Sequence, residues 1–158
     1  MTVARNKITV VPFDGLSLRQ LYDVLALRQE VFCVEQNCPY QDADGLDMVA
    51  WHVLLHDSKG CLQAYARVLP PGTVYGDEAS IGRVVSAPQA RGAGYGWRVM
   101  QAAIELCENN WPSIAVTLSA QSYLHEFYRR LGFENTGDFY LEDDIPHQKM
   151  RRGRKAAS

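Results

Sequence analysis

The chain reads VVSAPQARGAGYG over Val84–Gly96, where an apolar, strand-like run meets a glycine-rich loop with one arginine. A helical pattern follows, in which Trp97, Met100, Ile104 and Cys107 recur at helical spacing. Backbone N–H groups at a helix start lack partners within the helix and carry partial positive charge. Glycines let several of these groups approach one anion. The stretch therefore has the local features of a pyrophosphate-binding loop.

Two common phosphate-binding loops are excluded by residue type. A P-loop ends in Gly-Lys-Ser/Thr, whereas Trp97 follows Gly96 here. A dinucleotide-binding loop needs Gly-x-Gly-x-x-Gly, whereas the glycines here are Gly92, Gly94 and Gly96. The remaining pattern, Arg91-x-x-Gly-x-Gly, resembles the acyl-CoA loop of the GNAT superfamily of N-acetyltransferases. The alternative is a glycine-rich turn before an ordinary helix.

A second segment, after the strand-like run Ile114–Leu118, strengthens the resemblance. A predicted helix ends at Gly132, a typical C-terminal cap. One face of this helix carries Leu124, Phe127, Tyr128 and Leu131. The pattern Phe-Tyr-x-x-x-Gly-Phe resembles the other half of the acyl-CoA site, and the resemblance implies that Tyr128 protonates the leaving CoA thiolate. A phenol of pKa ~10 can protonate a thiolate of pKa ~8.5 at modest cost. The alternative is a core aromatic side chain.

The resemblance extends to the ElaA-type branch of the superfamily, from Leu16 to Met150. Its most specific segments are Cys38–Gln41, which reads CPYQ, and Asp144–His147, which reads DIPH. It implies an α/β GNAT fold, with a mixed, mostly antiparallel twisted sheet flanked by helices and splayed central strands that bind acyl-CoA. The donor it implies is acetyl-CoA; it supplies no acceptor.

The predicted acyl-CoA site combines the strand, the loop and one position of the second segment. An extended pantetheine arm would pair with the backbone of the strand before the loop. The superfamily often has Asn seven residues before the tyrosine, and Gln121 stands there instead. The predicted cofactor-binding residues are Val84, Val85, Ser86, Arg91, Gly92, Ala93, Gly94, Tyr95, Gly96 and Gln121.

Length and composition narrow the class of protein. We expect one domain over residues 1–158, with a frayed tail over 151–158. A net charge of −2 gives no electrostatic case for nucleic acid, and no apolar run approaches ~20 residues. The start, Met1–Lys7, lacks a signal-peptide core, and the four cysteines lack zinc spacing. We therefore expect a cytoplasmic enzyme without metal or membrane partner; its oligomeric state, a homodimer included, stays open.

The order of elements predicts strands early and βαβ units late, hence a mixed α/β sheet. Ser17 is a good N-cap for the first helix. The predicted elements are an edge strand Ile8–Phe13, a helix from Leu18 to about Val31, a loop Cys38–Asp47, strands Met48–His56, Cys61–Leu69 and Ser80–Val85, the helix after the glycine loop, the strand Ile114–Leu118, the Tyr128 helix, and a strand Phe139–Met150 interrupted at Pro146.

The front half is predicted to hold the acceptor. Arg28 shares an apolar helical face with Leu18 and Leu21. Burying a cation on such a face costs free energy unless an anion pairs with it. An acidic loop follows, without the spacing of an EF-hand. Arg28-x-x-x-Phe32, this loop and the Arg67 segment together resemble acyl-homoserine lactone synthases. The resemblance implies an amine-substrate wall of Arg28, Phe32, Asp42, Asp44, Asp47 and Arg67. The alternatives are a snorkelling arginine, a solvated acidic turn or a structural salt bridge.

The general base is left open among Glu35, Asp44, His52 and His147, because attack needs a neutral amine. His147 is also expected to contact substrate, since it follows Pro146 in a strand interruption. Cys38 is a weaker alternative, as an acyl nucleophile. The predicted activity is transfer of an acetyl group to a primary amine of a small molecule or peptide. The alternatives are a lactone-synthase-like acyltransferase and a non-catalytic acyl-CoA-binding protein.

Overall fold

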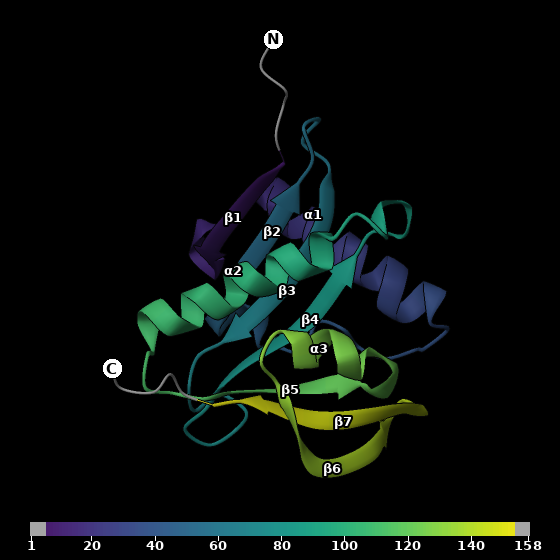
Figure 1. Ribbon diagram of the computed structural model, residues 1–158. Coiled ribbons are helices and arrows are strands. Elements are labelled where there is room, and N and C mark those ends of the chain that lie inside the picture. The colour runs from purple at the N-terminus through teal and green to yellow at the C-terminus, as the bar shows by residue number, and fades with distance from the viewer. Residues whose placement is uncertain (1–5, 154–158) are drawn as a thin grey trace.

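A seven-stranded sheet forms the centre of the computed structural model, which describes residues 6–153 (Figure 1). Its order is β1-β2-β3-β4-β5-β7-β6, and only β4 and β5 run parallel. The mixed, mostly antiparallel sheet predicted from the sequence is confirmed. The strands are β1 (Lys7–Pro12), β2 (Trp51–His56), β3 (Leu62–Leu69), β4 (Ala79–Ser86), β5 (Val116–Gln121), β6 (Glu134–Glu142) and β7 (Ile145–Arg152).

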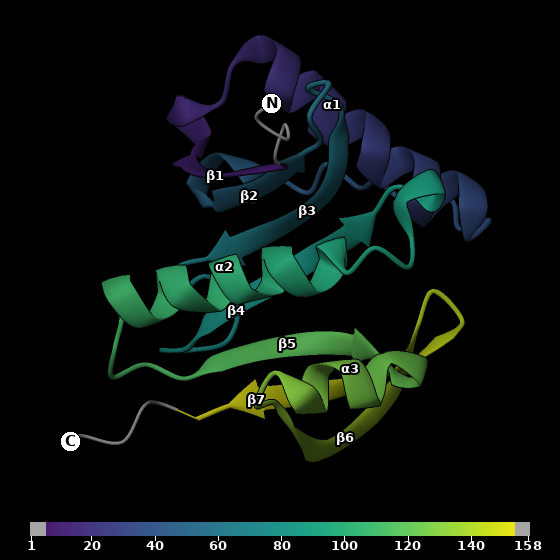
Figure 2. The same ribbon diagram turned by 45° about the horizontal axis from the view of Figure 1, so that its top comes forward.

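Helices cover both faces of the sheet (Figure 2). The first, α1 (Leu18–Arg28), packs on one face, and α2 (Tyr95–Asn110) and α3 (His125–Arg130) pack on the other. Successive residues of β2 and β3 alternate between these layers: Leu54 and Tyr65 pack with α1, whereas Val53 and Ala64 pack with α2. No helix within residues 6–153 is long and apolar enough to cross a membrane.

The first helix begins as predicted and then departs from the predicted stripe. Ser17 and Gln20 form a reciprocal capping box at its start. The buried residues are Val24, Leu27 and Arg28, whereas Leu18 is 88% exposed. Leu18 lies roughly 120° around the helix from Val24, because each residue advances the helix by roughly 100°. The prediction that Leu18 shares the buried face was therefore wrong.

A π-helical segment, Gln29–Glu35, extends α1 beyond its predicted end near Val31. The chain then runs as a loop to Asp47, as predicted, but Asp47–Val49 forms a short 3-10 turn. The strand predicted from Met48 therefore begins at Trp51. In α2 the predicted apolar face is confirmed, since Met100, Ile104 and Cys107 are buried.

The third helix ends in a Schellman motif, which confirms Gly132 as its cap. The Gly132 N–H donates to Arg129 at 3.0 Å, and the Phe133 N–H donates to Tyr128 at 3.1 Å. Gly132 has φ +94°. Only glycine enters this left-handed region without steric cost.

The last two strands form a hairpin, where the sequence predicted a single strand, Phe139–Met150, interrupted at Pro146. The turn is at Asp143–Asp144, which have φ +50° and +63°, and Pro146 lies inside β7. Pro146 is tolerated because β5 ends opposite His147, so no bond from β5 is due at the proline. Arg151 and Arg152 pair with β5, so the prediction of a frayed tail from Arg151 was wrong at these two residues. The rest of the predicted tail, residues 154–158, lies outside the described residues.

The two halves of the sheet separate where the parallel strands meet. β4 and β5 pair only through Ala79–Val116 and Ser80–Thr117. Further along, β4 has two residues, Arg83 and Val84, where β3 has only Ala66. Such a bulge bends and twists its strand. Beyond Ser80, β4 therefore leaves β5, which confirms the predicted splayed central strands.

The cap at Gly132 gives a test of the fold. Gly132→Ala should lower the free energy of unfolding by about 1–2 kcal/mol, because an alanine resists the left-handed conformation. Its Cβ would also lie 3.1 Å from Arg152 Nε. Urea denaturation measures the change. Gly153→Ala, at a glycine with no left-handed φ and no atom within 4 Å of the added Cβ, is the control. Equal effects of both substitutions would contradict the assignment.

Candidate active site

A cavity of about 830 Å³ lies where β4 and β5 separate. Its lining comes from both sides of the gap: the free part of β4, the start of α2, the end of β5, α3 and the β6–β7 hairpin. Seven of the predicted acyl-CoA and catalytic residues line it: Val84, Val85, Ser86, Arg91, Gly96, Gln121 and Tyr128.

The glycine loop borders this cavity through Arg91 and Gly96. Gly92 and Gly94 have φ +89° and +79°, and Gly94 is the N-cap of α2. Residues 92–95 are not among the lining residues, so the loop presents the cavity with Gly96 and the Arg91 side chain only. The Arg91 guanidinium forms an ion pair with Glu35 at 2.7 Å, and both side chains are about half exposed.

The Tyr128 ring is 6% exposed and packs edge-on against Phe127 and Phe133. Burial raises the pKa of its hydroxyl above the ordinary value. The phenol therefore stays protonated at neutral pH. A protonated phenol in the wall of the cavity can donate a proton but cannot act as a base.

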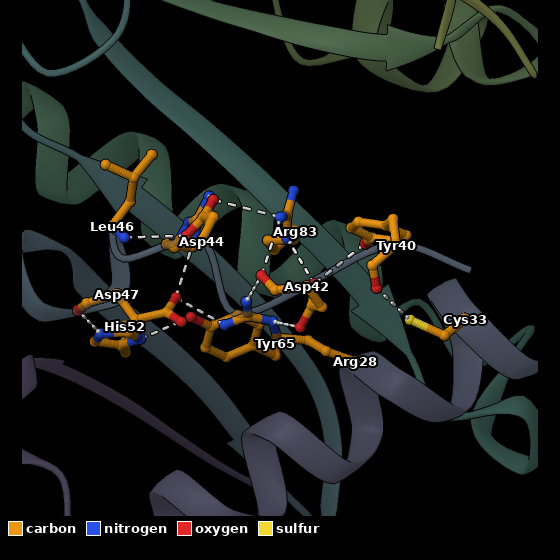
Figure 3. Close-up of polar contacts among 11 residues, drawn as sticks. Arg28, Cys33, Tyr40, Asp42, Asp44, Leu46, Asp47, His52, Tyr65 and Arg83 are labelled. Atoms are coloured by element: carbon orange, nitrogen blue, oxygen red, sulfur yellow. Dashed lines mark hydrogen bonds and ion pairs between the residues drawn. The ribbon is translucent and has the colours of Figure 1, made fainter. Parts of the chain in front are cut away.

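The predicted acidic loop closes a ring of alternating charges with arginines from three elements (Figure 3). Each arginine contacts two aspartates, and each aspartate contacts two arginines. In order around this charge ring the members are Arg28, Asp47, Arg67, Asp44, Arg83 and Asp42.

Arg28 is the most buried member of the charge ring, with a side chain 0% exposed. Its Nε donates to Asp42 and its Nη1 donates to Asp47, both at 2.8 Å. Its guanidinium also lies 5.9 Å from the centre of the Tyr65 ring. Burial alone would lower the pKa of Arg28, but the bond with Asp47 and the nearby charges outweigh it and raise the pKa. The arginine is therefore charged and fully paired.

The other two arginines connect the loop to the sheet. Arg67 of β3 donates to both oxygens of Asp44, at 2.8 and 2.9 Å, and to Asp47 at 3.0 Å. Arg83 lies in the β4 bulge with φ +50° and pairs with Asp42 at 2.8 Å. A left-handed φ is unfavourable for an arginine, so the charge ring holds a strained position of the strand.

The geometry favours the structural alternative for most of the predicted amine-substrate wall. Phe32 and Arg67 line the cavity, whereas Arg28, Asp42, Asp44 and Asp47 do not. Asp42 and Asp47 are only 5% and 8% exposed. Their charges are cancelled by the arginines, so they are not placed to attract a cationic substrate.

The candidate bases separate by position. His52 is fully buried and does not line the cavity. Its ring nitrogens form hydrogen bonds with the Tyr65 hydroxyl and the Asp47 carbonyl oxygen, and burial lowers its pKa. Asp44 is bound to Arg67. Glu35 lines the cavity but is paired near the glycine loop, and only His147 lies near the hairpin end. His147 reaches the cavity from a regular strand, and not from the predicted interruption at Pro146.

Sequence reasoning missed three residues that lie near His147, two of them in the cavity lining. Ser119 and Glu142 line the cavity, and Tyr140 stacks on the His147 ring with centroids 6.1 Å apart. A hairpin turn at Asp143–Asp144 would have predicted these residues, because it places Tyr140 opposite His147. Cys38 also lines the cavity, beside Asp143, and burial raises the pKa of its thiol, which does not favour a nucleophile.

Comparisons with known proteins agree with this fold. The family model of the acetyltransferase (GNAT) domain matches residues 50–153. Protein ElaA of Escherichia coli is 42% identical over 139 residues, which cover 87% of this chain and 90% of ElaA. The chain belongs to the GNAT acetyltransferase family, in its ElaA-type branch. The crystal structure of an acyl-CoA N-acyltransferase from Pseudomonas aeruginosa matches this GNAT protein with a TM-score of 0.87 and 45% identity, covering 93% of this chain and 99% of that chain.

The acyl-homoserine lactone synthase alternative receives support only at the level of fold. The structure of the synthase LasI matches with a TM-score of 0.77 and covers 94% of this GNAT protein and 90% of that chain. Its sequence is only 14% identical. The likeness therefore shows a shared architecture and carries no lactone chemistry to this chain.

The charge ring predicts acid sensitivity. Partial burial would raise the pKa of Asp44, but hydrogen bonds from Arg67 and the Leu46 N–H and nearby positive charge lower it to about 2; the pKa of Asp47 is lowered too. An unfolded aspartate has a pKa of about 3.9. The stabilisation is therefore complete above about pH 4–5 and is lost as the pH falls towards about 2. Urea denaturation between pH 7 and pH 2.5 measures this loss.

The matched variant for this test is Asp44→Asn, which should lower the free energy of unfolding at pH 7 and flatten its fall below pH 4. Asp14→Asn, at an exposed aspartate of the first 3-10 turn, leaves the charge ring intact and should keep the wild-type fall. An unchanged acid profile in Asp44→Asn would show that the charge ring does not set the acid limit.

Proposed function

We propose that this GNAT protein transfers an acetyl group from acetyl-CoA to a primary amine by direct attack of the amine on the thioester. The observation that carries the proposal is one cavity lined by the free edge of β4, the start of α2 and the Tyr128 phenol. Each of these provides one part of what an acyl-CoA donor needs.

The free edge of β4 suits the pantetheine arm. Val84, Val85 and Ser86 line the cavity beyond the last pairing of β4 with β5. The β5 side of this segment therefore has no strand partner, and backbone groups there need one. The amides of an extended pantetheine arm can supply such partners, as an added strand would.

The start of α2 suits the pyrophosphate. Gly94 caps a helix of 16 residues, so unpaired N–H groups and the positive end of the helix dipole point towards the loop. Arg91 adds a half-exposed cation. Its exposed pair with Glu35 is worth only about 0–1 kcal/mol, so a pyrophosphate can replace the carboxylate as its partner.

Tyr128 suits the leaving group. The amine nitrogen would attack the thioester carbonyl, and the C–S bond would break as the tetrahedral intermediate collapses. The departing thiolate lies in the same buried environment as the phenol. Tyr128, kept protonated by burial, would donate its proton to the sulfur. A non-catalytic acyl-CoA-binding protein would share the cavity but would have no use for this proton.

Binding of the donor is the first test. Acetyl-CoA at about 100 times its Kd should stabilise the native state by about 2.7 kcal/mol and raise the Tm. Gly94→Asp should abolish this gain, because it places a carboxylate in the anion site. Gly60→Asp is a matched control: both glycines have left-handed φ, +79° and +82°, and open space around a Cβ. No rise in Tm with the wild-type protein would count against the proposal.

Tyr128→Phe is the second test, because it deletes only the hydroxyl. The kcat for thiol release should fall by about 10²–10⁴-fold, while the Kd for acetyl-CoA stays close to wild type. Tyr22→Phe, at an exposed tyrosine of α1, is the control. An unchanged kcat in Tyr128→Phe would mean that another group protonates the thiolate, or that the protein only binds acyl-CoA.

A further inference from the structure

The three C-terminal strands present a polar face to the cavity. Gln121 of β5, His147 of β7 and Tyr140 of β6 are directly paired in register, so their side chains project to one face. Ser119 and Glu142 lie two residues along from Gln121 and Tyr140 and share that face. The alternate residues of β5, Leu118 and Ala120, pack in the core with Tyr128 of α3.

The cavity therefore connects two faces of the sheet through the gap between β4 and β5. Tyr128 reaches it from the α3 side, and His147 and Glu142 reach it from the opposite side. A thioester held in the gap would have its sulfur near the phenol and its carbonyl carbon open to the opposite face. This face is where an acceptor can approach.

The two polar contacts of the His147 ring indicate where a proton can bind, which is Nε2. Its Nδ1 lies 2.7 Å from the Ile145 carbonyl oxygen, which can only accept, so Nδ1 carries a hydrogen. Its Nε2 lies 3.3 Å from Glu142 Oε2, which also only accepts when ionised. In the neutral ring, a lone pair would face a carboxylate. A proton between Nε2 and Glu142 removes this repulsion, and a bound ammonium group can supply it.

We propose that Glu142 and His147 bind the ammonium group of the acceptor, that His147 is its general base, and that the acceptor is a cationic primary amine with no carboxylate on the amine-bearing carbon. The inference rests on the acyl transfer proposed above. The class of amine follows from charge. Glu142 and Asp143 both line this end of the cavity, and a carboxylate beside the reacting nitrogen would face them. Of the arginines that line the cavity, Arg67 and Arg83 are already paired with aspartates, and Arg91 is assigned above to the pyrophosphate.

The surrounding groups hold this pair in place. The Tyr140 ring stacks on the imidazole with an angle of 17° between the planes. The Tyr140 hydroxyl bonds to Ser119, whose hydroxyl also donates to Glu142 at 3.3 Å. The carboxylate is thus oriented from β5 and β6 together, beside a ring fixed by its own strand.

The proton and bond changes balance. The ammonium gives one proton to His147 Nε2, and the imidazolium lies between the Ile145 carbonyl and the Glu142 carboxylate. The neutral amine forms the new N–C bond, and the C–S bond breaks. The CoA sulfur takes the Tyr128 proton. The surplus proton on the amide nitrogen passes to water, which reprotonates the phenolate, and the His147 proton leaves to solvent.

Glu142→Gln tests the ammonium site with little risk to folding, since the Glu142 side chain is 55% exposed. The KM for the amine should rise at least tenfold, while the KM for acetyl-CoA changes less than twofold. Glu134→Gln makes the same substitution on the same strand, at an exposed residue outside the cavity lining, and should leave both values unchanged. An unaltered amine KM in Glu142→Gln would overturn the assignment.

His147→Gln tests the base. The kcat should fall by about 10²–10⁴-fold with acetyl-CoA affinity intact. His147 is 8% exposed, so the Tm and the Kd for acetyl-CoA are measured on the same variant. Loss of acetyl-CoA binding together with kcat would indicate a structural role and overturn the base assignment, and so would an unchanged kcat.

Three matched pairs of acceptors test the substrate class: pentylamine and norleucine, phenethylamine and phenylalanine, agmatine and arginine. Each second member adds only a carboxylate to the amine-bearing carbon. The kcat/KM should be at least tenfold higher for the amine in every pair that reacts. Higher values for the carboxylates, or no turnover of any amine by a protein that binds acetyl-CoA, would overturn this inference. Failure of acetyl-CoA to bind would instead contradict the proposed acyl transfer itself.

Discussion

The closed ring of three arginines and three aspartates is the interaction on which the site depends. It joins the end of α1, the loop that follows it, β3 and the bulge of β4. A buried charge that loses its partner costs about 3–5 kcal/mol, which ties the buried members Arg28, Asp42 and Asp47 to one another. The loop over Asp42–Asp47, which has almost no regular secondary structure, is therefore held by side-chain contacts to α1, β3 and β4.

The consequence of this constraint is the shape of the sheet. Arg83 is held at φ +50° while it pairs with Asp42, and this bulge turns β4 away from β5. The separation leaves the backbone of Val84–Ser86 without a strand neighbour on the β5 side and opens the cavity to both faces. A phenol on one face and an imidazole–carboxylate pair on the other then lie on either side of the place where we propose that the thioester binds.

The parts that sequence predicted well are those determined by local physics. The capping residues Ser17 and Gly132, the glycine loop before α2 and the position of Tyr128 all follow from neighbouring residues. Most strands were found within three residues of their ends. The family resemblance supplied the topology, which local patterns could not.

The parts that sequence missed depend on residues far apart in the chain. A pattern of Asp42, Asp44 and Asp47 does not reveal that three arginines will neutralise it, so an acidic surface was a reasonable hypothesis and a buried network was the outcome. The positive φ of Arg83 arises from that network, and no glycine marks it. Glu142 was missed because Phe139–Met150 was predicted as one interrupted strand, so the pairing that brings Tyr140 and Glu142 beside His147 was not expected.

The most direct measurement is the Kd for acetyl-CoA in Arg83→Gln, by isothermal titration. Glutamine keeps the Cβ, and so the backbone cost of the bulge, but cannot pair with Asp42 and Asp44. If the charge ring holds the bulge that opens the cavity, the Kd should rise at least tenfold in a variant that remains folded. Arg19→Gln, at an exposed ion pair on α1, should bind as the wild type does. An unchanged Kd in a folded Arg83→Gln protein would contradict the central role of the charge ring.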